Sequence, residues 1–254
     1  MIDKNLCDQF LEEQWEDMTW SYSRISSFVS CPYSWYETYI LGHRSGNFYA
    51  YTGSAYHKIM EDFYNFWLNG GRLDMKTIIA TLDIKLNRRF EVNPYTDRYA
   101  QSTYDKLLDS LNYFQIFEDV TAVERLIEWD IAGYMFQGYI DLDAGEWHYD
   151  WKSSWDEEKY ARQQNLYLYA KEQVDGIVTK GFKIPQYKNK LKIETVNRNQ
   201  FYIDDAVEWV QLTIPQIKKA LENAEFVKKT PSSFFCVRLC SAKNCEHRDY
   251  NGNT

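Results

Sequence analysis

Residues 146–152 alternate polar and aromatic side chains without interruption, in the order Glu-Trp-His-Tyr-Asp-Trp-Lys. A period of two is typical of a β-strand that is buried on one face and polar on the other. Residues 134–143 favour a second strand, and Ala144-Gly145 can form a two-residue hairpin loop between the two. The sequence therefore predicts an antiparallel hairpin, which excludes a purely helical fold.

The loop determines which residues of the hairpin face each other. The predicted pairs are Asp143 with Glu146, Asp141 with His148, and Tyr139 with Asp150. Because paired residues point to the same side of a sheet, we expect Asp141, Asp150 and Lys152 to share one face, with the two aspartates as diagonal neighbours roughly 7–8 Å apart. A slip of one residue would abolish this arrangement.

Two carboxylates and a lysine on one strand face suit phosphodiester hydrolysis. Asp141 and Asp150 supply the hard oxygen ligands that Mg²⁺ prefers, and a bound cation neutralises phosphate and activates water. Lys152 can orient the water or stabilise the developing charge. The alternative is a charged, solvated strand face. For these three residues taken alone the alternative is favoured, because such triplets are common.

The order of predicted elements indicates a mixed α/β (α+β) fold. We expect helices near 4–17, from Ser21 or Ser23 to about 40 with a break near Cys31, after Gly53-Ser54, and near 75–91, 98–118, 156–174 and 205–226. Strands are expected over 122–132, 134–143, 146–152, 177–184 and 190–196. In domain terms, residues 1–120 form a helical N-terminal part, 121–200 the core, and 201–254 a C-terminal helix and Cys-rich tail, all in one compact unit.

Composition and net charge indicate where the protein acts and how it can bind nucleic acid. No apolar stretch approaches the roughly 20 residues that span a bilayer, and no signal peptide is evident, so we expect a cytoplasmic protein without membrane partners. The net charge of −8 argues against tight nonspecific coating of nucleic acid. A local basic track is still available from Lys183, Lys188, Lys190 and Lys192. These lysines are equally compatible with a solvated edge strand that resists aggregation.

Five cysteines are present, and three of them, Cys236, Cys240 and Cys245, lie close together near the C-terminus. An odd number without a signal peptide does not indicate a disulfide framework. The clustering suggests a metal site, in preference to reduced buried thiols. Cys7 fits no ligand pattern and is expected to be a free cysteine.

Several motifs, taken in order, resemble the PD-(D/E)XK nucleases of the RecB-like branch. Asp141 followed by Asp150-Trp151-Lys152 resembles the motif that names the superfamily, with Ile140 in place of Pro. The other pieces are Ser23 to Phe28 followed by Cys31-Pro32-Tyr33, Gly53 with His57 and Glu61, Glu124 and Gly138 on the strands before the first aspartate, and Gln163 with Tyr167. Each piece is weak alone, but five pieces in the family's order are specific.

The resemblance implies a restriction-endonuclease-like central sheet flanked by helices and assigns roles to individual residues. Asp141, Asp150, the Trp151 carbonyl and His57 are expected to bind Mg²⁺ or Mn²⁺, and Lys152 is expected to be the catalytic lysine. Without the resemblance, His57 would be taken for a half-buried structural histidine. Glu61 either orients His57 or has a surface role. Gln163 and Tyr167 either flank the site or pack their helix on the sheet.

The C-terminal cysteines resemble the iron–sulfur subgroup, which includes CRISPR-associated and phage RecB-like exonucleases. Cys31 would complete a set with Cys236, Cys240 and Cys245 that holds a [4Fe–4S] cluster. Their spacing displaces the middle cysteine by one residue from the subgroup's pattern, so a zinc site that includes His247 stays open.

The leading hypothesis is thus a metal-dependent DNA exonuclease that acts on ends or single strands. It is phage-encoded, and so active in the bacterial host cytoplasm, or linked to recombination, replication or CRISPR-adaptation proteins. The alternatives are a nuclease-like DNA-binding or scaffold subunit without turnover and a zinc-stapled interaction protein. The complete Asp, Asp, Lys and His set argues against the subunit without turnover.

Overall fold

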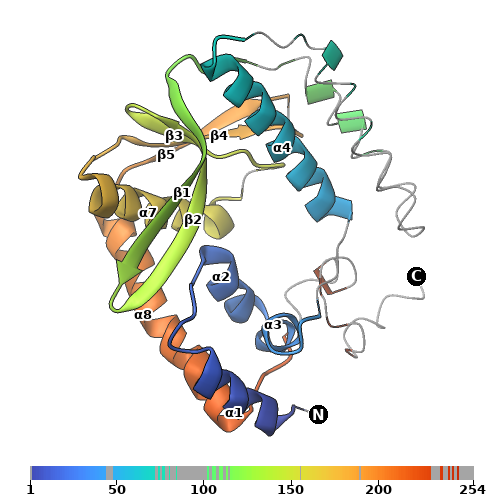
Figure 1. Cartoon of the computed structure of the whole chain (residues 1–254), viewed down its shortest axis with the longest axis vertical. Coiled ribbons are helices and arrows are strands. Elements are labelled where there is room, and N and C mark those ends of the chain that lie inside the picture. Colours follow the sequence, from blue (N-terminus) through green and yellow to red (C-terminus); the bar gives the residue numbers. More distant parts are fainter. Residues whose placement is uncertain are drawn as a thin grey trace. The chain divides into compact units, whose positions relative to one another are not determined.

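The computed structural model describes residues 2–43, 48–71, 115–154, 156–188 and 190–229, together with positions 74, 76–77, 80, 84, 102, 105–106, 109–110, 113, 235–236, 240, 242 and 245. The chain divides into two compact units. The first comprises Met1–Ser45, Glu128–Gln137 and Asp204–Thr254, and the second comprises Gly46–Ile127 and Gly138–Ile203. Strands β1 (Val120–Ile131) and β2 (Tyr134–Ala144) and helix α8 (Gln200–Asn223) contribute residues to both (Figure 1).

The first unit contains α1 (Lys4–Glu13), α2 (Tyr22–Ser30), α3 (Pro32–Tyr39) and most of α8. The Ser21 side chain caps α2 by accepting a hydrogen bond from the Arg24 amide. Cys31 is extended, with φ −159°, and Pro32 begins α3. Since proline lacks an N–H and suits the first turn of a helix, it ends α2 and starts α3. The predicted break at Cys31 is confirmed.

Two helix ends in this unit differ from the prediction. Helix α1 ends at Glu13 rather than at 17, because the chain turns and brings Trp15 into edge contact with Trp20, at 5.4 Å between ring centroids. Helix α8 ends at Asn223 rather than at 226. Ala224 adopts φ 51°, and the amide of Glu225 donates to the Ala220 carbonyl, which is the Schellman ending of a helix.

A mixed five-stranded sheet is ordered β1-β2-β3-β4-β5, with β3 (Trp147–Tyr149), β4 (Gly181–Gln186) and β5 (Lys192–Asn197) in the second unit. Strands β2 and β3 are antiparallel, β3 and β4 parallel, and β4 and β5 antiparallel. Helix α4 (Phe48–Leu68) packs on Leu142, Tyr149 and Trp151. Helix α7 (Glu157–Asp175) contacts the residues that alternate with these, so the sheet lies between two helices. The predicted fold class is confirmed.

Several boundaries in the second unit also need correction. Helix α4 begins at Phe48, not after Gly53-Ser54, because the Ser54 hydroxyl donates to the Ala50 carbonyl inside the helix instead of capping it. Strand β4 begins at Gly181 rather than 177, and β5 at Lys192 rather than 190. Most of the predicted helices 75–91 and 98–118 lies outside the described residues.

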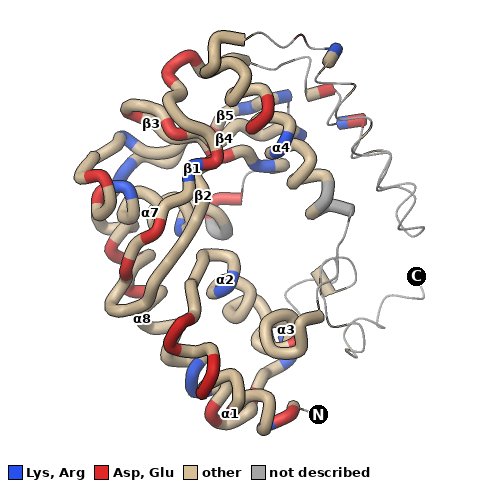
Figure 2. The backbone as a smooth tube through the Cα atoms, viewed as in Figure 1, with Lys and Arg blue, Asp and Glu red and all other residues tan. Residues whose placement is uncertain are grey.

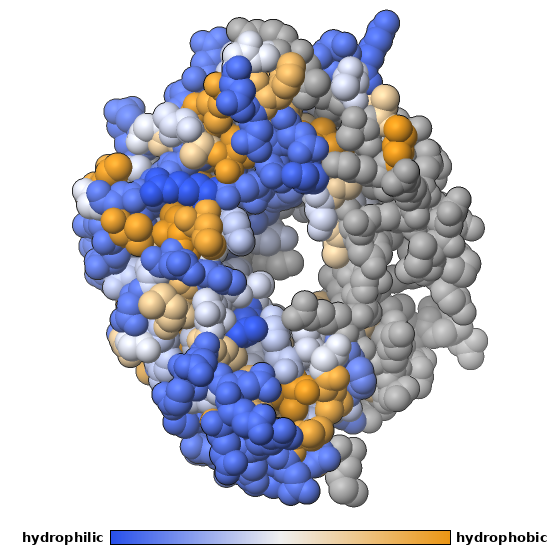
Figure 3. All heavy atoms as spheres, in the orientation of Figure 1, coloured by the Kyte–Doolittle hydropathy of each residue, from blue (hydrophilic) through white to orange (hydrophobic). Residues whose placement is uncertain are grey.

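The core of the second unit is rich in aromatic residues. Tyr56 of α4 stacks on Tyr187 at 4.2 Å, and Phe117 stacks on Tyr149 at 4.1 Å between ring centroids. On the face shown in Figure 3, hydrophobic atoms form separate patches between hydrophilic ones. Within the part of the chain that is described, no helix combines the length and the apolar character that crossing a bilayer requires.

Candidate active site

The hairpin that carries both aspartates has a different register from the one predicted. Leu142 pairs with Tyr149 and Asp143 with His148, so the reversal falls at Gly145-Glu146 instead of Ala144-Gly145. Continuing this register by one step sets Asp141 opposite Asp150. Because the register differs from the predicted one by two residues, Asp141 and Asp150 still share one face, although the pairing itself ends at Leu142 and Tyr149. The predicted register would have set Asp143 against Glu146, two like charges.

The hairpin separates immediately beyond Tyr149, where the predicted strand was to continue to 152. The amides of Asp150 and Lys152 donate to two carbonyls of β4, those of Lys183 and Pro185, at 3.2 Å each. The Trp151 amide donates to Asp141 Oδ2 at 2.7 Å, in a contact that is fully buried. The Asp141 side chain thus takes the place of a backbone acceptor between the diverging strands.

His57 of α4 reaches the same point. Its Nδ1 lies 3.4 Å from Asp141 Oδ1 and 3.8 Å from Glu124 Oε1, and its Nε2 lies 3.1 Å from the Trp151 carbonyl oxygen. Burial alone would lower the pKa of His57, but Asp141 and Glu124 outweigh it and raise this pKa to about 10. Burial likewise opposes ionisation of Asp141, whereas His57 and Lys152 hold its pKa below the usual range.

Glu124 is a candidate ligand that the sequence did not assign to the metal. In the described part of the chain, one group of potential ligand atoms lies mutually within 4.8 Å, and it comes from His57, Glu124 and Asp141. Glu124 has φ 45°, a left-handed conformation that is uncommon for a non-glycine residue and tends to occur at functional sites. Carboxylate oxygens and an imidazole nitrogen suit Mg²⁺ or Mn²⁺, so these residues fit such an ion.

Asp150 and Lys152 form an ion pair on the α7 side of this group. Lys152 Nζ lies 2.8 Å from Asp150 Oδ2, and the Gln164 amide nitrogen donates to the same oxygen. Burial raises the pKa of Asp150 to about 6, against the effect of Lys152. Burial alone would lower the pKa of Lys152, but Asp150 and Asp141 raise it above its usual range. The lysine is therefore an ammonium group at neutral pH. Gln164 had not been singled out.

Gln163 and Tyr167 connect α7 to this ammonium group. Lys152 Nζ donates to Gln163 Oε1 at 3.2 Å, and Gln163 Nε2 donates to the Tyr167 hydroxyl at 3.4 Å. The Tyr167 ring lies over Gly138 of β2, where an added Cβ would come within 2.4 Å of a ring carbon. Gly138 therefore leaves the room in which the tyrosine ring sits.

The predicted basic track lies on β4, β5 and the turn between them, among the blue segments of Figure 2. Lys183 Nζ lies 5.4 Å from the ring centroids of both Trp147 and Tyr149. Lys190 Nζ lies 5.5 Å from the Tyr113 ring, and burial lowers the pKa of Lys188. Lys192 is paired with Glu194. Aromatic rings therefore lie beside two of the four lysines, Lys183 and Lys190.

The four predicted ligand cysteines all belong to the first unit and are buried, with exposed fractions of 5% for Cys31, 6% for Cys236, 7% for Cys240 and 8% for Cys245. Burial raises the pKa of Cys236, and the other three thiols raise it further. Amide hydrogens of Lys229 and Ala242 point at Cys31 Sγ and Cys240 Sγ, at 3.5 and 3.4 Å. The structure brings the four together. His247 lies outside the described residues.

Cys7 is also buried, and burial raises the pKa of its thiol. Its contributing neighbours are charged residues of α1 and its cap, Lys4, Asp8 and Asp3, rather than other cysteines. It is therefore separate from the group of four ligand candidates, as expected.

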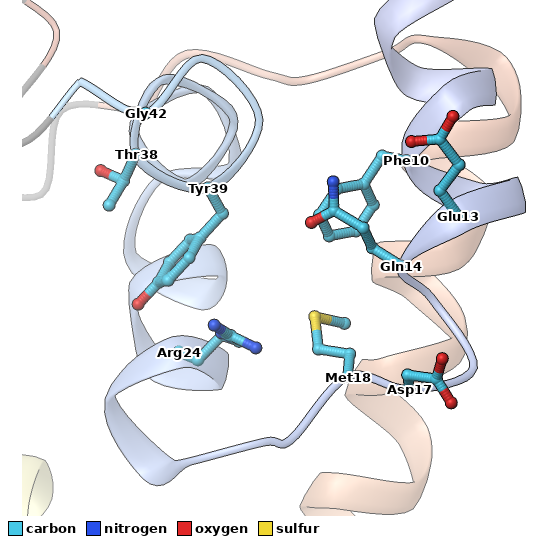
Figure 4. Close-up of a pocket in the computed structure, with 9 residues that line it drawn as sticks. All are labelled: Phe10, Glu13, Gln14, Asp17, Met18, Arg24, Thr38, Tyr39 and Gly42. Carbon is cyan, nitrogen blue, oxygen red and sulfur yellow. The ribbon is translucent and has the colours of Figure 1, made fainter.

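A pocket of about 420 Å³ lies within the first unit, between α1, α2 and α3 (Figure 4). The Arg24 guanidinium points into it, held by a 2.7 Å hydrogen bond to the Thr19 carbonyl and by the Tyr39 ring at 4.8 Å. Glu13 and Asp17 also line it, which disfavours a phosphate. Its described lining includes none of the predicted catalytic residues.

The comparisons with known proteins agree with this geometry. The family model described as the PD-(D/E)XK nuclease superfamily matches residues 19–249. The crystal structure of a candidate exonuclease from Eubacterium rectale superposes with a TM-score of 0.56 at 13% identity, over 97% of this chain and 93% of that one. At this identity, the likeness shows the fold alone. No curated protein matches the chain.

Proposed function

Because the chain belongs to the PD-(D/E)XK nuclease superfamily, we propose that it is a divalent-metal-dependent deoxyribonuclease that removes nucleotides from DNA ends or single strands. The observation that carries the proposal is the meeting of His57, Glu124 and Asp141 within 4.8 Å, with the Asp150–Lys152 pair beside them. Four separate elements, α4, β1, β2 and the segment after β3, supply these groups.

We assign the metal ligands to Asp141, Asp150, His57 and the Trp151 carbonyl, and we add Glu124. When bound, Mg²⁺ or Mn²⁺ neutralises the scissile phosphate and lowers the pKa of a coordinated water. In the metal-free protein the protonated His57 sits among the acceptors, so its ring must lose a proton before a nitrogen can serve as a ligand.

Lys152 is assigned the role of catalytic lysine. Asp150 and Asp141 raise its pKa, which favours the ammonium form that donates hydrogen bonds to water or to a phosphate oxygen. Gln163 fixes the direction of Nζ through its side-chain oxygen. Tyr167 holds the Gln163 amide in turn, so both residues act by positioning Lys152.

We propose more specifically that the enzyme is an exonuclease acting on unpaired ends. The candidate exonuclease with the same fold supports it only by analogy. Lys183 beside Trp147 and Tyr149 offers a cation and aromatic faces, the two features that bind unpaired bases and phosphates. We also propose that the protein acts in the cytoplasm, which is that of the bacterial host if the chain is phage-encoded. Its partners there would be recombination, replication or CRISPR-adaptation proteins.

We further propose that Cys31, Cys236, Cys240 and Cys245 hold a [4Fe–4S] cluster. A tetrahedral Zn²⁺ with bonds of about 2.3 Å would bring thiolate sulfurs to about 3.8 Å from one another. Among the residues described, no three of these sulfurs fall within 4.8 Å of one another. A wider spacing suits the larger cluster, and the amide hydrogens at Cys31 and Cys240 are of the kind that surround cluster ligands. Zinc is the alternative.

A cleavage assay tests the catalytic proposal. Purified protein is incubated with linear single-stranded, linear duplex and closed circular DNA in Mn²⁺, Mg²⁺ or EDTA. We expect metal-dependent loss of the linear substrates from their ends, abolished in Asp150→Asn. Glu146→Gln, which changes an exposed acid in the turn of the same hairpin, is the matched control and should cleave normally. Equal cleavage by wild type and Asp150→Asn would contradict the proposal, and cleavage of the circle would contradict its exonuclease part.

A further inference from the structure

A second set of ionisable side chains lies on β1, β2, β3 and α7, a few residues along the chain from residues of the candidate site. We call it the charge cluster, and its members are Arg125, Asp143, His148, Lys171 and Asp175. Arg125 follows Glu124 on β1, Asp143 lies two residues after Asp141 on β2, His148 lies two before Asp150, and Lys171 lies four after Tyr167 on α7. Strand β1, the β2–β3 hairpin with the residues that follow it, and α7 thus each carry residues of the site and of the cluster.

Asp143 is the centre of the charge cluster. Its Oδ2 accepts from Arg125 at 2.6 Å and from Lys171 at 2.8 Å, and its Oδ1 lies 2.9 Å from His148 Nδ1. Asp175 joins the two cations again, at 2.7 Å from Arg125 and 2.6 Å from Lys171. The side chains of His148, Lys171 and Asp143 are 0%, 3% and 6% exposed, so water is largely excluded.

Burying so many charges is a poor way to gain stability, because apolar residues of the same volume would often stabilise the fold as much. Buried ion pairs that join several strands and a helix are better suited to selecting one packing arrangement of those strands and that helix. The observed hairpin register supports this reading. It sets Asp143 opposite His148, whereas the register with an Ala144-Gly145 loop would set Asp143 against Glu146 and leave His148 opposite Asp141.

We propose that the charge cluster positions the metal site: by joining β1, the β2–β3 hairpin and α7, it fixes how Glu124, Asp141 and Asp150 approach one another. Within the described part of the chain, no hydrogen bond or ion pair joins a member of the charge cluster to a proposed metal ligand. The inference rests on the proposed metal-binding function of those ligands.

The test is Mn²⁺ titration of the full-length protein by calorimetry, with amide hydrogen exchange at Trp151 as a readout independent of metal and activity. Lys171→Met removes the central cation, and we expect at least about tenfold weaker Mn²⁺ binding, the size of effect seen when groups behind metal ligands are lost. We also expect faster exchange of the Trp151 amide, which donates to Asp141. Lys171→Arg should restore both.

Glu172→Gln is the matched control, since it breaks an ion pair with Arg198 from the adjacent position of the same helix. It should leave both readouts within twofold of wild type. If Lys171→Met does not fold, Asp175→Asn, which removes a partly exposed member of the cluster, replaces it with the same expectation.

Two results overturn the inference, and they are distinct from failure of the proposed function. A folded Lys171→Met variant with wild-type Mn²⁺ affinity and Trp151 exchange would show that the cluster positions nothing. If the wild type itself binds no Mn²⁺, the proposed function fails. The cluster is then judged on Trp151 exchange alone, and an unchanged rate overturns the inference.

Discussion

His57 Nδ1 lies 3.4 Å from Asp141 Oδ1, while the opposite nitrogen of the same ring lies 3.1 Å from the Trp151 carbonyl oxygen. A ring that faces an acceptor on each side is suited to the doubly protonated form, in agreement with its pKa of about 10. The imidazolium therefore supplies, in the metal-free protein, the positive charge that a divalent ion would bring. Proton and metal compete for the same acceptors.

Replacing His57 with Ala should separate these two roles. Without metal, Asp141 loses the partly buried imidazole that lies 3.4 Å from its Oδ1, and we expect the variant to be less stable by about 1–3 kcal/mol. With metal, we expect Mn²⁺ affinity at least about tenfold weaker and cleavage strongly reduced. Chemical denaturation with and without Mn²⁺, together with calorimetry, measures both effects. Wild-type stability in EDTA would contradict the role of His57 as the compensating charge.

Substitution of Glu124 should relieve backbone strain but remove a proposed metal ligand. Its φ of 45° is readily adopted by glycine and tolerated by asparagine. Glu124→Gly should therefore relieve a strain of order 1 kcal/mol and fold at least as well as Glu124→Ala, yet bind Mn²⁺ more weakly than wild type. Glu124→Asn retains an oxygen ligand, so its Mn²⁺ affinity should fall between those of wild type and Glu124→Gly. Thermal unfolding and metal titration of the three variants check this order. Wild-type Mn²⁺ affinity in all three variants would remove Glu124 from the ligand set.

Asp175 should influence stability in acid. Burial alone would raise its pKa, but Lys171 and Arg125 hold it below its usual value. Since the unfolded chain has the ordinary pKa of about 3.9, the carboxylate stabilises the fold above that pH, and the contribution is lost as the pH falls through the lower folded pKa. We expect Asp175→Asn to be less stable than wild type at pH 7 and to change less with pH below about 4. Urea unfolding across pH 2–7 tests this, and parallel curves would refute it.

The buried cysteines lead to a spectroscopic prediction. Anaerobically purified wild type should be brown, with absorbance near 400 nm and bound iron, by general iron–sulfur chemistry. Cys31→Ser should lose the iron and the colour and unfold at lower temperature, because the ligand joins the start of α3 to the C-terminal segment. Cys7→Ser, at a buried thiol outside the group, is the control and should keep its iron. A colourless wild type that contains stoichiometric zinc would establish the zinc alternative.

Local sequence patterns were sufficient for the elements themselves. The alternation over residues 146–152 placed a strand here, but β3 covers only Trp147–Tyr149, and its polar face is buried too, since His148 and Asp150 are 0% and 5% exposed. Pro32 marked the division between α2 and α3. Because side chains alternate with a period of two, the shared face of Asp141 and Asp150 survived a register error of two residues. The turn chemistry alone did not distinguish Ala144-Gly145 from Gly145-Glu146 as the loop.

What the sequence missed depends on contacts between distant segments. Glu124 was placed on the strand before Asp141, but its left-handed conformation, which accompanies its place near His57, has no local signal. Gln164 next to Gln163 offered no reason to prefer a contact with Asp150. The ion pairs around Asp143 come from residues far apart in the chain, and the alternation pattern says only that its side chain shares a face with Asp141 and His148.

The contact between Gly138 and Tyr167 has a consequence for evolution. Since a Cβ at position 138 would come within 2.4 Å of the tyrosine ring, any side chain there requires the ring to move or to be replaced. A relative that carries a larger residue where this chain has Gly138 should also have exchanged its tyrosine for a smaller side chain. The residues at these two positions should therefore identify, from sequence alone, those homologues in which the surroundings of Lys152 differ.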